Sequence, residues 1–109
     1  MAELEESGGP AAEIVTGTDD TGTPVIAVSG DLDISNADEL RASVTALVAS
    51  DPERLVFDLS DLRFIDSAGI AVLLGAASHV EDVRLRKPSP AVRRVVELTG
   101  LAEVLPIEA

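Results

Sequence analysis

The amino-acid sequence predicts a single α/β domain built on a mixed β-sheet, with strands and helices in the order ββαβαβα and the helices packed on the sheet. A chain of 109 residues is long enough for one hydrophobic core and too short for two. Hydrophobic residues make up 46% of the chain, yet only Phe57 and Phe64 are aromatic, so the core must be aliphatic. Beyond Gly30, apolar runs alternate with segments of helical periodicity, the pattern of parallel strands joined by crossover helices.

The first third of the chain predicts a leader followed by a β-hairpin. Residues 1–11 contain three glutamates and a Gly-Gly-Pro sequence without any periodicity, so we expect a flexible acidic leader and place the folded domain at 12–109. Two β-branched runs, 13–16 and 24–29, flank an Asp-Asp-Thr-Gly turn sequence. This arrangement indicates two antiparallel strands.

The middle of the chain predicts two helices around a central strand. Apolar residues recur at helical spacing after Ser35 or Asn36, either of which can cap the helix, with an acid three residues on to complete a capping box. The run 54–60 has the continuous apolar character of a strand covered on both faces. We expect a loop at 61–64 and, because 67–80 carries no charge, a mostly buried helix there.

The last third predicts a strand, a helix and a short tail. Alternating apolar and basic residues over 82–87 are typical of a half-exposed strand. Ser89 and Pro90 suit the N-cap and first position of the next helix, and Gly100 suits its left-handed end. The tail contains Pro106, so it can supply at most an edge strand.

Charge and composition exclude several classes of partner and site. Twenty acidic and eight basic residues give a formal net charge of −12, which opposes binding to the phosphate backbone of nucleic acid. The sequence holds no apolar run long enough to span a bilayer and no export signal, so we expect a cytoplasmic protein without membrane insertion. The absence of cysteine excludes disulfides and thiolate sites.

Ser67, at the start of the uncharged segment, is a poor candidate for a catalytic nucleophile. The serine elbow Gly-x-Ser-x-Gly is incomplete because Ile65 replaces its leading glycine. The single histidine, His79, lies roughly 18 Å further along the same expected helix, too far to act as a base. Metal and phosphate-binding sequences are also absent. We therefore expect no enzyme activity and no cofactor, and local sequence alone favours a helix cap at Asp66 and Ser67.

Three segments stand out together: GDLDISNADELR at 30–41, LVFDLSDLRFIDSAGIAVLLGA at 55–76 and SPAVRRVVELTGL at 89–101. In this order and at these spacings they resemble the STAS domain family, in particular the bacterial anti-sigma factor antagonists, over residues 12–107. The resemblance implies a partner-switching protein that binds an anti-sigma factor with a serine-kinase fold and so releases a sigma factor. It also implies inactivation when that kinase phosphorylates the protein, and a phosphatase that reverses the modification.

The resemblance further implies which residues form the site. The family's phosphorylated serine corresponds to Ser67 in the sequence Asp-Ser-Ala-Gly, and Ala68 stands where many members have a second serine. The family's acidic turn corresponds to Asp31 and Asp33. The partner-binding positions implied in this way are Asp31, Asp33, Asp66, Ala68, Gly69 and Val72. A phosphate on Ser67 would face the positive end of the helix among acidic residues, and we expect it to block docking by charge and bulk while leaving the fold intact.

Other functions stay open at this point. The small residues after Ser67 suit either the close approach of a partner or tight packing of the helix on the sheet. A STAS subunit of a membrane lipid transporter, in which Ser67 is structural, is the first alternative to the antagonist. A scaffold component of a stress-signalling assembly is the second.

Overall fold

Five strands and three helices follow one another along the described part of the chain, residues 12–108. The structure is a computed structural model, and the leader expected at 1–11 lies outside the residues it describes. The strands are β1 (Ala12–Thr18), β2 (Pro24–Leu32), β3 (Arg54–Asp58), β4 (Leu62–Ile65) and β5 (Asp82–Arg86). The helices are α1 (Ala37–Val48), α2 (Ser67–Ala77) and α3 (Pro90–Leu98), followed by a 3₁₀ helix (Leu101–Glu103). The α/β fold class is confirmed.

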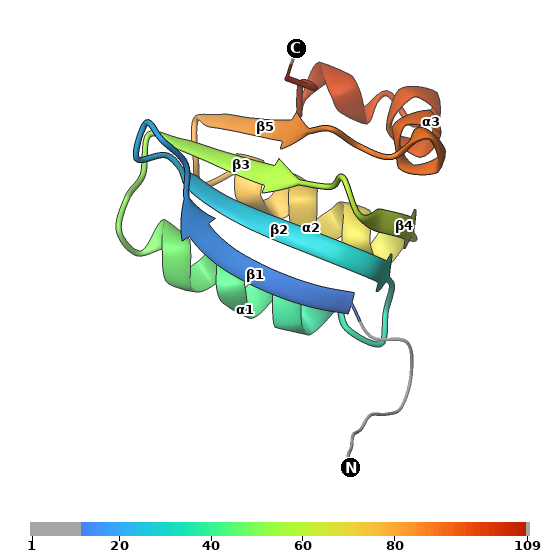
Figure 1. The fold of residues 1–109 in the computed structure, drawn as a ribbon, viewed down its shortest axis with the longest axis horizontal. Coiled ribbons are helices and arrows are strands. Elements are labelled where there is room, and N and C mark those ends of the chain that lie inside the picture. Colours follow the sequence, from blue (N-terminus) through green and yellow to red (C-terminus); the bar gives the residue numbers. More distant parts are fainter. Residues whose placement is uncertain (1–11, 109) are drawn as a thin grey trace.

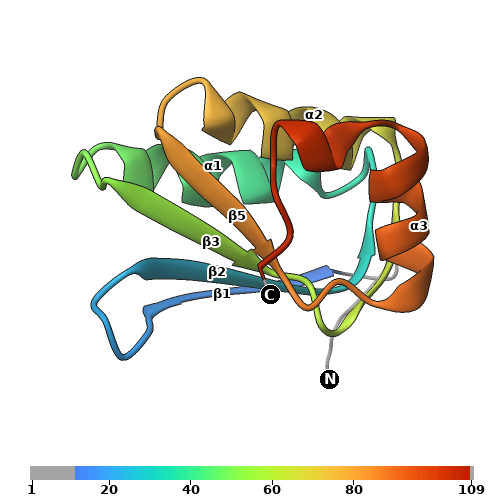
Figure 2. The same cartoon turned by 90° about the horizontal axis from the view of Figure 1, so that it is seen from above.

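The sheet has helices on one face and none of the described helices on the other (Figures 1 and 2). Its strand order is β1-β2-β3-β5, and β4 lies beside the second half of β2. β1 is antiparallel to β2, whereas the other neighbouring strands are parallel. α1 and α2 cover one face, and α3 packs beside β4 at one end of the sheet. Because the strands from β2 onward run the same way, their carboxyl ends lie at one edge of the molecule.

The segment expected to be a loop at 61–64 contributes a strand, so that prediction was wrong and the order is ββαββαβα. β2 is nine residues long and pairs with β3 through its first half and with β4 through its second half, with a register shift after Gly30. The chain therefore continues from β3 into β4 in the same direction, without the crossover helix that parallel neighbours usually need. A four-residue strand whose two middle residues, Arg63 and Phe64, are exposed lacks the alternation that marks a strand in the sequence.

β3 is buried on both faces, as its sequence predicts, but by different kinds of residue. Leu55 and Phe57 belong to the core under the helices, while Val56 lies outside that cluster and is equally inaccessible to solvent. Its neighbour on β5 is Arg84 rather than an apolar residue. On its other side Val56 lies next to Val25 of β2, so an apolar and a long polar side chain flank it on the helix-free face.

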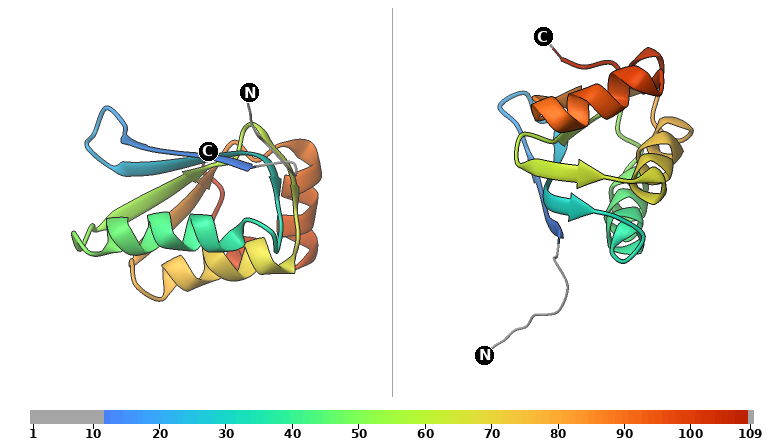
Figure 3. Two further views of the ribbon diagram at one scale, coloured as in Figure 1. Left: turned by 90° about the horizontal axis from the view of Figure 1, so that it is seen from below. Right: turned by 90° about the vertical axis from the view of Figure 1, so that its right-hand side faces the viewer.

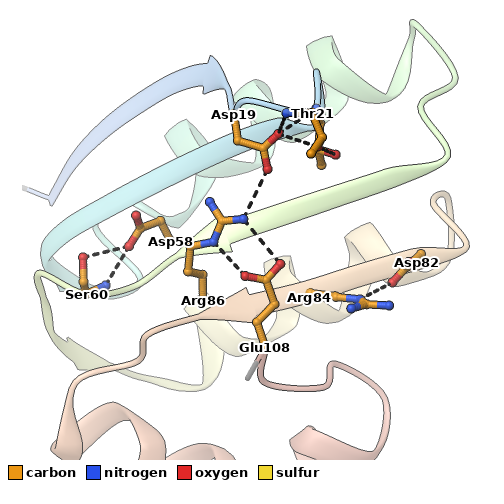
Figure 4. A network of polar contacts seen from close by, with 9 residues as sticks. Asp19, Thr21, Asp58, Ser60, Asp82, Arg84, Arg86 and Glu108 are labelled. Atoms are coloured by element: carbon orange, nitrogen blue, oxygen red, sulfur yellow. Dashed lines mark hydrogen bonds and ion pairs between the residues drawn. The ribbon is translucent and has the colours of Figure 1, made fainter.

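Ion pairs hold the helix-free face together where the hairpin and the tail meet (Figure 4). Arg86 on β5 pairs with Glu108 at 2.7 Å and with Asp19 in the hairpin turn at 3.3 Å. The Leu85 N–H donates to the carbonyl of Pro106 at 2.9 Å, and the Glu108 N–H donates to the carbonyl of Leu85 at 2.8 Å. The tail therefore makes one bridge to the edge of β5, within the limit that Pro106 sets.

The hydrogen bonds of Asp19 in the hairpin turn should make part of the free energy of unfolding depend on pH. The hydrogen bond from the Thr21 hydroxyl is the main cause that lowers the pKa of the Asp19 carboxyl from 3.8 to about 2. A group with a depressed pKa stabilises the fold above its ordinary pKa and loses this contribution as the pH falls through the lowered value. Asp19→Asn should therefore lower the urea midpoint at pH 7 and flatten its decline between about pH 4 and about pH 2.

Asp20, the exposed residue that follows Asp19, supplies the control for this prediction. Asp20→Asn changes the same charge at a position without the hydrogen bonds of Asp19, so the urea midpoint and its pH profile should stay close to wild type. Equal losses in the two variants would show that overall charge, and not the turn, sets the effect.

Candidate functional site

The acidic turn and the start of α2 meet where β2 and β4 end (Figure 3, right panel). Leu32 lies opposite Ile65 in the parallel pair, and the Asp66 N–H donates to the carbonyl of Leu32 at 3.1 Å. The two strands deliver the chain to the N-terminal ends of α1 and α2, which lie side by side. The structure thus places the segments around Asp33 and Ser67 at the same edge of the sheet.

The Asp66 carboxylate joins the two segments. Its Oδ1 accepts hydrogen bonds from the N–H groups of Ala68 at 2.9 Å and Gly69 at 3.1 Å, so Asp66 is the N-cap of α2. Its Oδ2 accepts a third bond from the N–H of Ile34, 32 positions earlier in the chain, at 3.2 Å. An aspartate at a helix N-terminus satisfies backbone donors that would otherwise lack partners. Asp66 therefore fixes the α2 start and the β2–α1 loop in one arrangement.

Asn36 orders the acidic turn from within the protein. It is 6% exposed, its Oδ1 accepts a bond from the Asp33 N–H at 2.9 Å, and its Nδ2 donates to the carbonyl of Asp31 at 2.9 Å. Asn36 occupies the N-cap position of α1 without a side-chain bond to the helix, so the expected capping box is not formed. A buried amide with both ends bonded is costly to replace. The sequence pattern did not reveal this role, because the bonding partners of Asn36, at Asp31 and Asp33, precede the helix.

Both acids of the turn have cationic or hydroxyl partners. The Asp31 carboxylate lies 3.4 Å from the guanidinium of Arg63 on β4. The Ser35 hydroxyl and then the Ser35 N–H, both donating to Asp33, lower the pKa of that carboxyl below its ordinary 3.8. Asp33 is therefore anionic at neutral pH, and the edge carries fixed negative charge beside the α2 start.

Ser67 occupies the first position of α2 and is exposed. Its hydroxyl makes no hydrogen bond to any other described residue, because Asp66 already supplies the cap. Ala71 and Leu74 continue the exposed side of the helix at helical spacing, and α2 carries no charged side chain. The prediction that this helix is mostly buried was wrong, since only one side of it packs on the sheet. A uniformly small and apolar sequence does not reveal which side that is.

Gly69 and Val72 are on the packed side of α2. Val72 is 4% exposed, and Gly69 is buried so closely that an added Cβ would lie 2.8 Å from Cγ1 of Ile65 and 2.9 Å from the side chain of Leu32. Neither residue presents a side chain to solvent, so a contact of these side chains with a docked partner is not compatible with this arrangement. Their small size instead lets α2 approach the ends of β2 and β4. Ala68, next to Ser67, is partly exposed.

Two large apolar side chains at this edge were missed from the sequence. Ile34 in the β2–α1 loop is 81% exposed, and Phe64 on β4 is 51% exposed. Single exposed apolar residues are ordinary on a protein surface, and these two belong to the β2–α1 loop and to β4, the segments that meet the start of α2. The sequence feature that could have indicated an exposed apolar residue here is Ile34 itself, because it is the isoleucine between Asp33 and Ser35 in a polar turn.

The described residues contain no group of three or more histidine, aspartate or glutamate side chains placed to hold a metal ion. Within the same part of the chain, no helix has the length and apolar character needed to cross a membrane.

The close packing at Gly69 predicts a loss of stability on a minimal substitution. Gly69→Ala forces a methyl group into the side chains of Ile65 and Leu32, and should lower the free energy of unfolding by about 1–3 kcal/mol in urea titrations. Gly75→Ala is the control, because that helical glycine has no atom within 4 Å of its added Cβ, and the variant should gain about 0.5–1 kcal/mol. Two variants of equal stability would contradict the packing described.

With the fold and the site defined, comparison with known sequences identifies the family. The chain matches the STAS domain over residues 13–109. The anti-sigma F factor antagonist of Lysinibacillus sphaericus is 32% identical over 84 residues, which cover 72% of each protein. The anti-sigma-F factor antagonist RsfB of Mycobacterium tuberculosis is 30% identical over 95 residues, which cover 84% of this chain and 78% of RsfB.

Solved structures agree with the sequence comparison. An anti-sigma factor antagonist from Mycobacterium paratuberculosis superposes with a TM-score of 0.82 at 31% identity, covering 89% of this chain and 85% of the other. The unphosphorylated form of the antagonist SpoIIAA shares the fold with a TM-score of 0.75 at 24% identity, covering 89% of each chain. On the match over residues 13–109 and these relatives, the chain belongs to the STAS domain family.

Proposed function

We propose that this protein is an anti-sigma factor antagonist: a cytoplasmic, non-enzymatic regulator that binds a kinase-type anti-sigma factor and is switched off by phosphorylation of Ser67. The names of its relatives support the antagonist function. The observation that carries the switch is the exposed Ser67 hydroxyl, which has no partner among the described residues although it stands at a rigidly capped helix start. A phosphatase would restore the active form.

The contact surface we propose, the edge surface, surrounds this hydroxyl. Its members are exposed or partly exposed residues from the β2–α1 loop, β4 and α2: Asp33, Ile34, Phe64, Ser67, Ala68 and Ala71. Asp31 and Asp66 contribute to this surface indirectly. Asp31 pairs with Arg63, and Asp66 holds the β2–α1 loop by accepting a hydrogen bond from the Ile34 N–H. Gly69 and Val72 contribute only by their packing.

Charge explains how a phosphate on Ser67 would act. Phosphorylation adds about −1.5 to −2 charges, and the positive end of α2 tolerates them. The edge already carries the anionic Asp33, so the added charge increases repulsion toward an acidic group on a partner. Two unit charges about 7 Å apart at an effective dielectric of about 20 repel by about 2.4 kcal/mol, enough to weaken binding by tens of fold. The fold has no reason to change, since no described residue depends on the Ser67 hydroxyl.

Solved STAS structures fit this interpretation at the level of the fold. SpoIIAA has been described in a phosphorylated form, and it shares the fold of this chain at 24% identity. A STAS fold can therefore carry a phosphate. The position of the phosphate in this chain is the proposal.

Phosphorylation can be tested directly. The purified protein is incubated with ATP and with each kinase-type anti-sigma factor of its source organism, and phosphate is located by mass spectrometry. We expect one phosphate, on Ser67, and none on the variant Ser67→Ala. Copurification with a transporter ATPase, without phosphate on Ser67, would favour the lipid-transporter alternative and contradict the switch.

The exposed isoleucine gives an independent test of the edge surface. Ile34→Ala removes an apolar group that is 81% exposed, so the free energy of unfolding should stay unchanged while affinity for the anti-sigma factor falls by about tenfold. Leu98→Ala is the matched control, because Leu98 is 77% exposed on α3 and lies outside the edge surface. Isothermal titration calorimetry measures the affinity of each variant for the anti-sigma factor. Equal affinities for the two variants would show that Ile34 does not belong to the edge surface.

A further inference from the structure

Two outer strands of the sheet are covered by other parts of the chain. The Leu85 N–H of β5 donates to the Pro106 carbonyl at 2.9 Å, and the Leu85 carbonyl accepts from the Glu108 N–H at 2.8 Å, so the tail occupies this edge. β4 packs against α3. β1 lies on the side of the sheet opposite β5 (Figure 1), and no described segment pairs with its outer side.

The register of the hairpin shows which backbone groups of β1 point outward. The Asp19 N–H donates to the Thr23 carbonyl at 3.0 Å, and this pair continues the register in which Thr18 faces Pro24. Bonded and non-bonded pairs alternate along an antiparallel ladder, so every second residue back from Asp19 bonds to β2. The N–H and C=O groups that point away from β2 belong to the intervening residues, Ala12, Ile14, Thr16 and Thr18. The last three of these have no other backbone partner within residues 12–108.

β1 lacks the features that usually prevent an exposed strand from pairing with another chain. Such features include proline, lysine, a bulge and a very short length. β1 is seven residues long, pairs with β2 without a register shift, and has Glu13 as its only charged residue. A row of outward N–H and C=O groups is complementary to the backbone of another extended strand. The outer side of β1 therefore fits a β-strand.

The sequence of β1 is complementary to itself in one antiparallel register. When Val15 lies opposite Val15 of a second copy, all seven residues are paired and every outward-pointing residue meets another. Glu13 then lies opposite Gly17, which has no side chain, and Ile14 lies opposite Thr16. The two Glu13 residues are about 14 Å apart along the strands, at about 3.4 Å per residue, which exceeds the Debye length of about 8 Å at physiological salt. The register therefore places no like charges face to face.

Val15 supplies an apolar contact at the centre of this register. Ile14 packs against the core under the helices, so Val15 points to the helix-free face, where it is 56% exposed. Opposite Val15 of the second copy it would form a non-hydrogen-bonded pair, the kind in which facing side chains are closest. Pairs of β-branched residues across strands stabilise a sheet. A second copy of the chain would thus cover both the open backbone and this side chain.

We propose that two copies of the chain join through β1 into one continuous sheet, with Val15 of each copy at a twofold axis perpendicular to the sheet. Closed twofold symmetry is the commonest arrangement of soluble oligomers. The helices of both copies lie on the same face of the joined sheet, and the parallel strands of the two copies run in opposite directions. The two edge surfaces therefore lie at opposite ends of the dimer, each open to its own partner. The inference does not depend on the proposed function.

Sedimentation equilibrium of the full chain tests whether the dimer forms. Each copy has a formal net charge of −12, so repulsion opposes association and salt should strengthen it. We expect a dimer with a dissociation constant between about 1 μM and about 1 mM at about 1 M salt, where the Debye length is about 3 Å. A protein that stays monomeric throughout this range would overturn the inference.

Opposite charges placed at Val15 test the register. Val15→Lys and Val15→Glu each put like charges face to face across the axis, so each variant alone should dimerise about tenfold more weakly than wild type. An equimolar mixture of the two variants should form a heterodimer with about wild-type affinity. Val104→Lys is the matched control, because Val104 is also 56% exposed and lies far along the chain, after the 3₁₀ helix. A mixture that associates no better than either variant alone would show that Val15 does not lie on the axis, and so would contradict the proposal.

A change in the backbone provides a test that does not involve charge. Thr16→Pro removes an N–H that points away from β2, and proline is accepted at a strand edge in this orientation. The variant should keep the wild-type circular dichroism spectrum and lose the dimer. Full dimerisation of a folded Thr16→Pro protein would assign the contact to another surface and rule out pairing through β1.

Amide hydrogen exchange distinguishes a second copy from another segment of the same chain, and it requires no variant. The N–H groups of Ile14, Thr16 and Thr18 should exchange quickly at concentrations where the protein is monomeric and gain protection as the dimer forms. Protection that is already complete in the monomer would show that the chain covers β1 itself, which is incompatible with the inference. Phosphorylation of Ser67 and binding to an anti-sigma factor are measured separately, so failure of the dimer leaves the proposed function standing.

Discussion

The geometry of the candidate site depends on one carboxylate, that of Asp66. It accepts two hydrogen bonds from the first turn of α2 and a third from the Ile34 N–H in the β2–α1 loop. Bonds from backbone donors to an ionised acceptor are stronger than neutral ones, and here they join segments 32 positions apart. Because Asp66 supplies the N-cap of α2, the hydroxyl of Ser67 at the next position is not needed to hold the helix start. A group added to this exposed hydroxyl would therefore break no hydrogen bond within the described part of the chain.

The rest of the domain acts as a rigid support for this edge. An aliphatic core fills the space between the sheet and α1 and α2, and Gly69 allows α2 to lie directly on the ends of β2 and β4. On the helix-free face, the Arg86 ion pairs connect the hairpin turn, β5 and the tail (Figure 4). Closely packed interiors resist gradual deformation. A charge added at the exposed end of α2 therefore changes the surface that a partner meets more readily than it changes the fold.

Local patterns in the sequence predicted the hairpin, the three helices and β5, because each depends on residues close together in the chain. The phosphate-acceptor candidate, Ser67, came from the resemblance to the STAS family, since local sequence alone favoured a helix cap there. Local patterns did not predict β4, a short strand that joins β2 without a crossover helix. Nor did they reveal the roles of Asn36 and Ile34, which depend on contacts across loops and on exposure. α2 shows the limit most clearly: its residues are almost uniformly small or apolar, so its sequence could not distinguish the side packed on Leu32 from the side open to solvent.

The central claim is that charge on Ser67 controls docking while the fold stays the same. The most direct measurement compares the affinity of the unmodified protein and of the protein with phosphoserine installed at position 67, for the same anti-sigma factor, at low and high salt. The account predicts binding weaker by tens of fold for the phosphorylated form, a smaller difference at high salt, and equal thermal unfolding temperatures. Equal affinities, or a phosphorylated form that binds weakly because it has lost its fold, would contradict it.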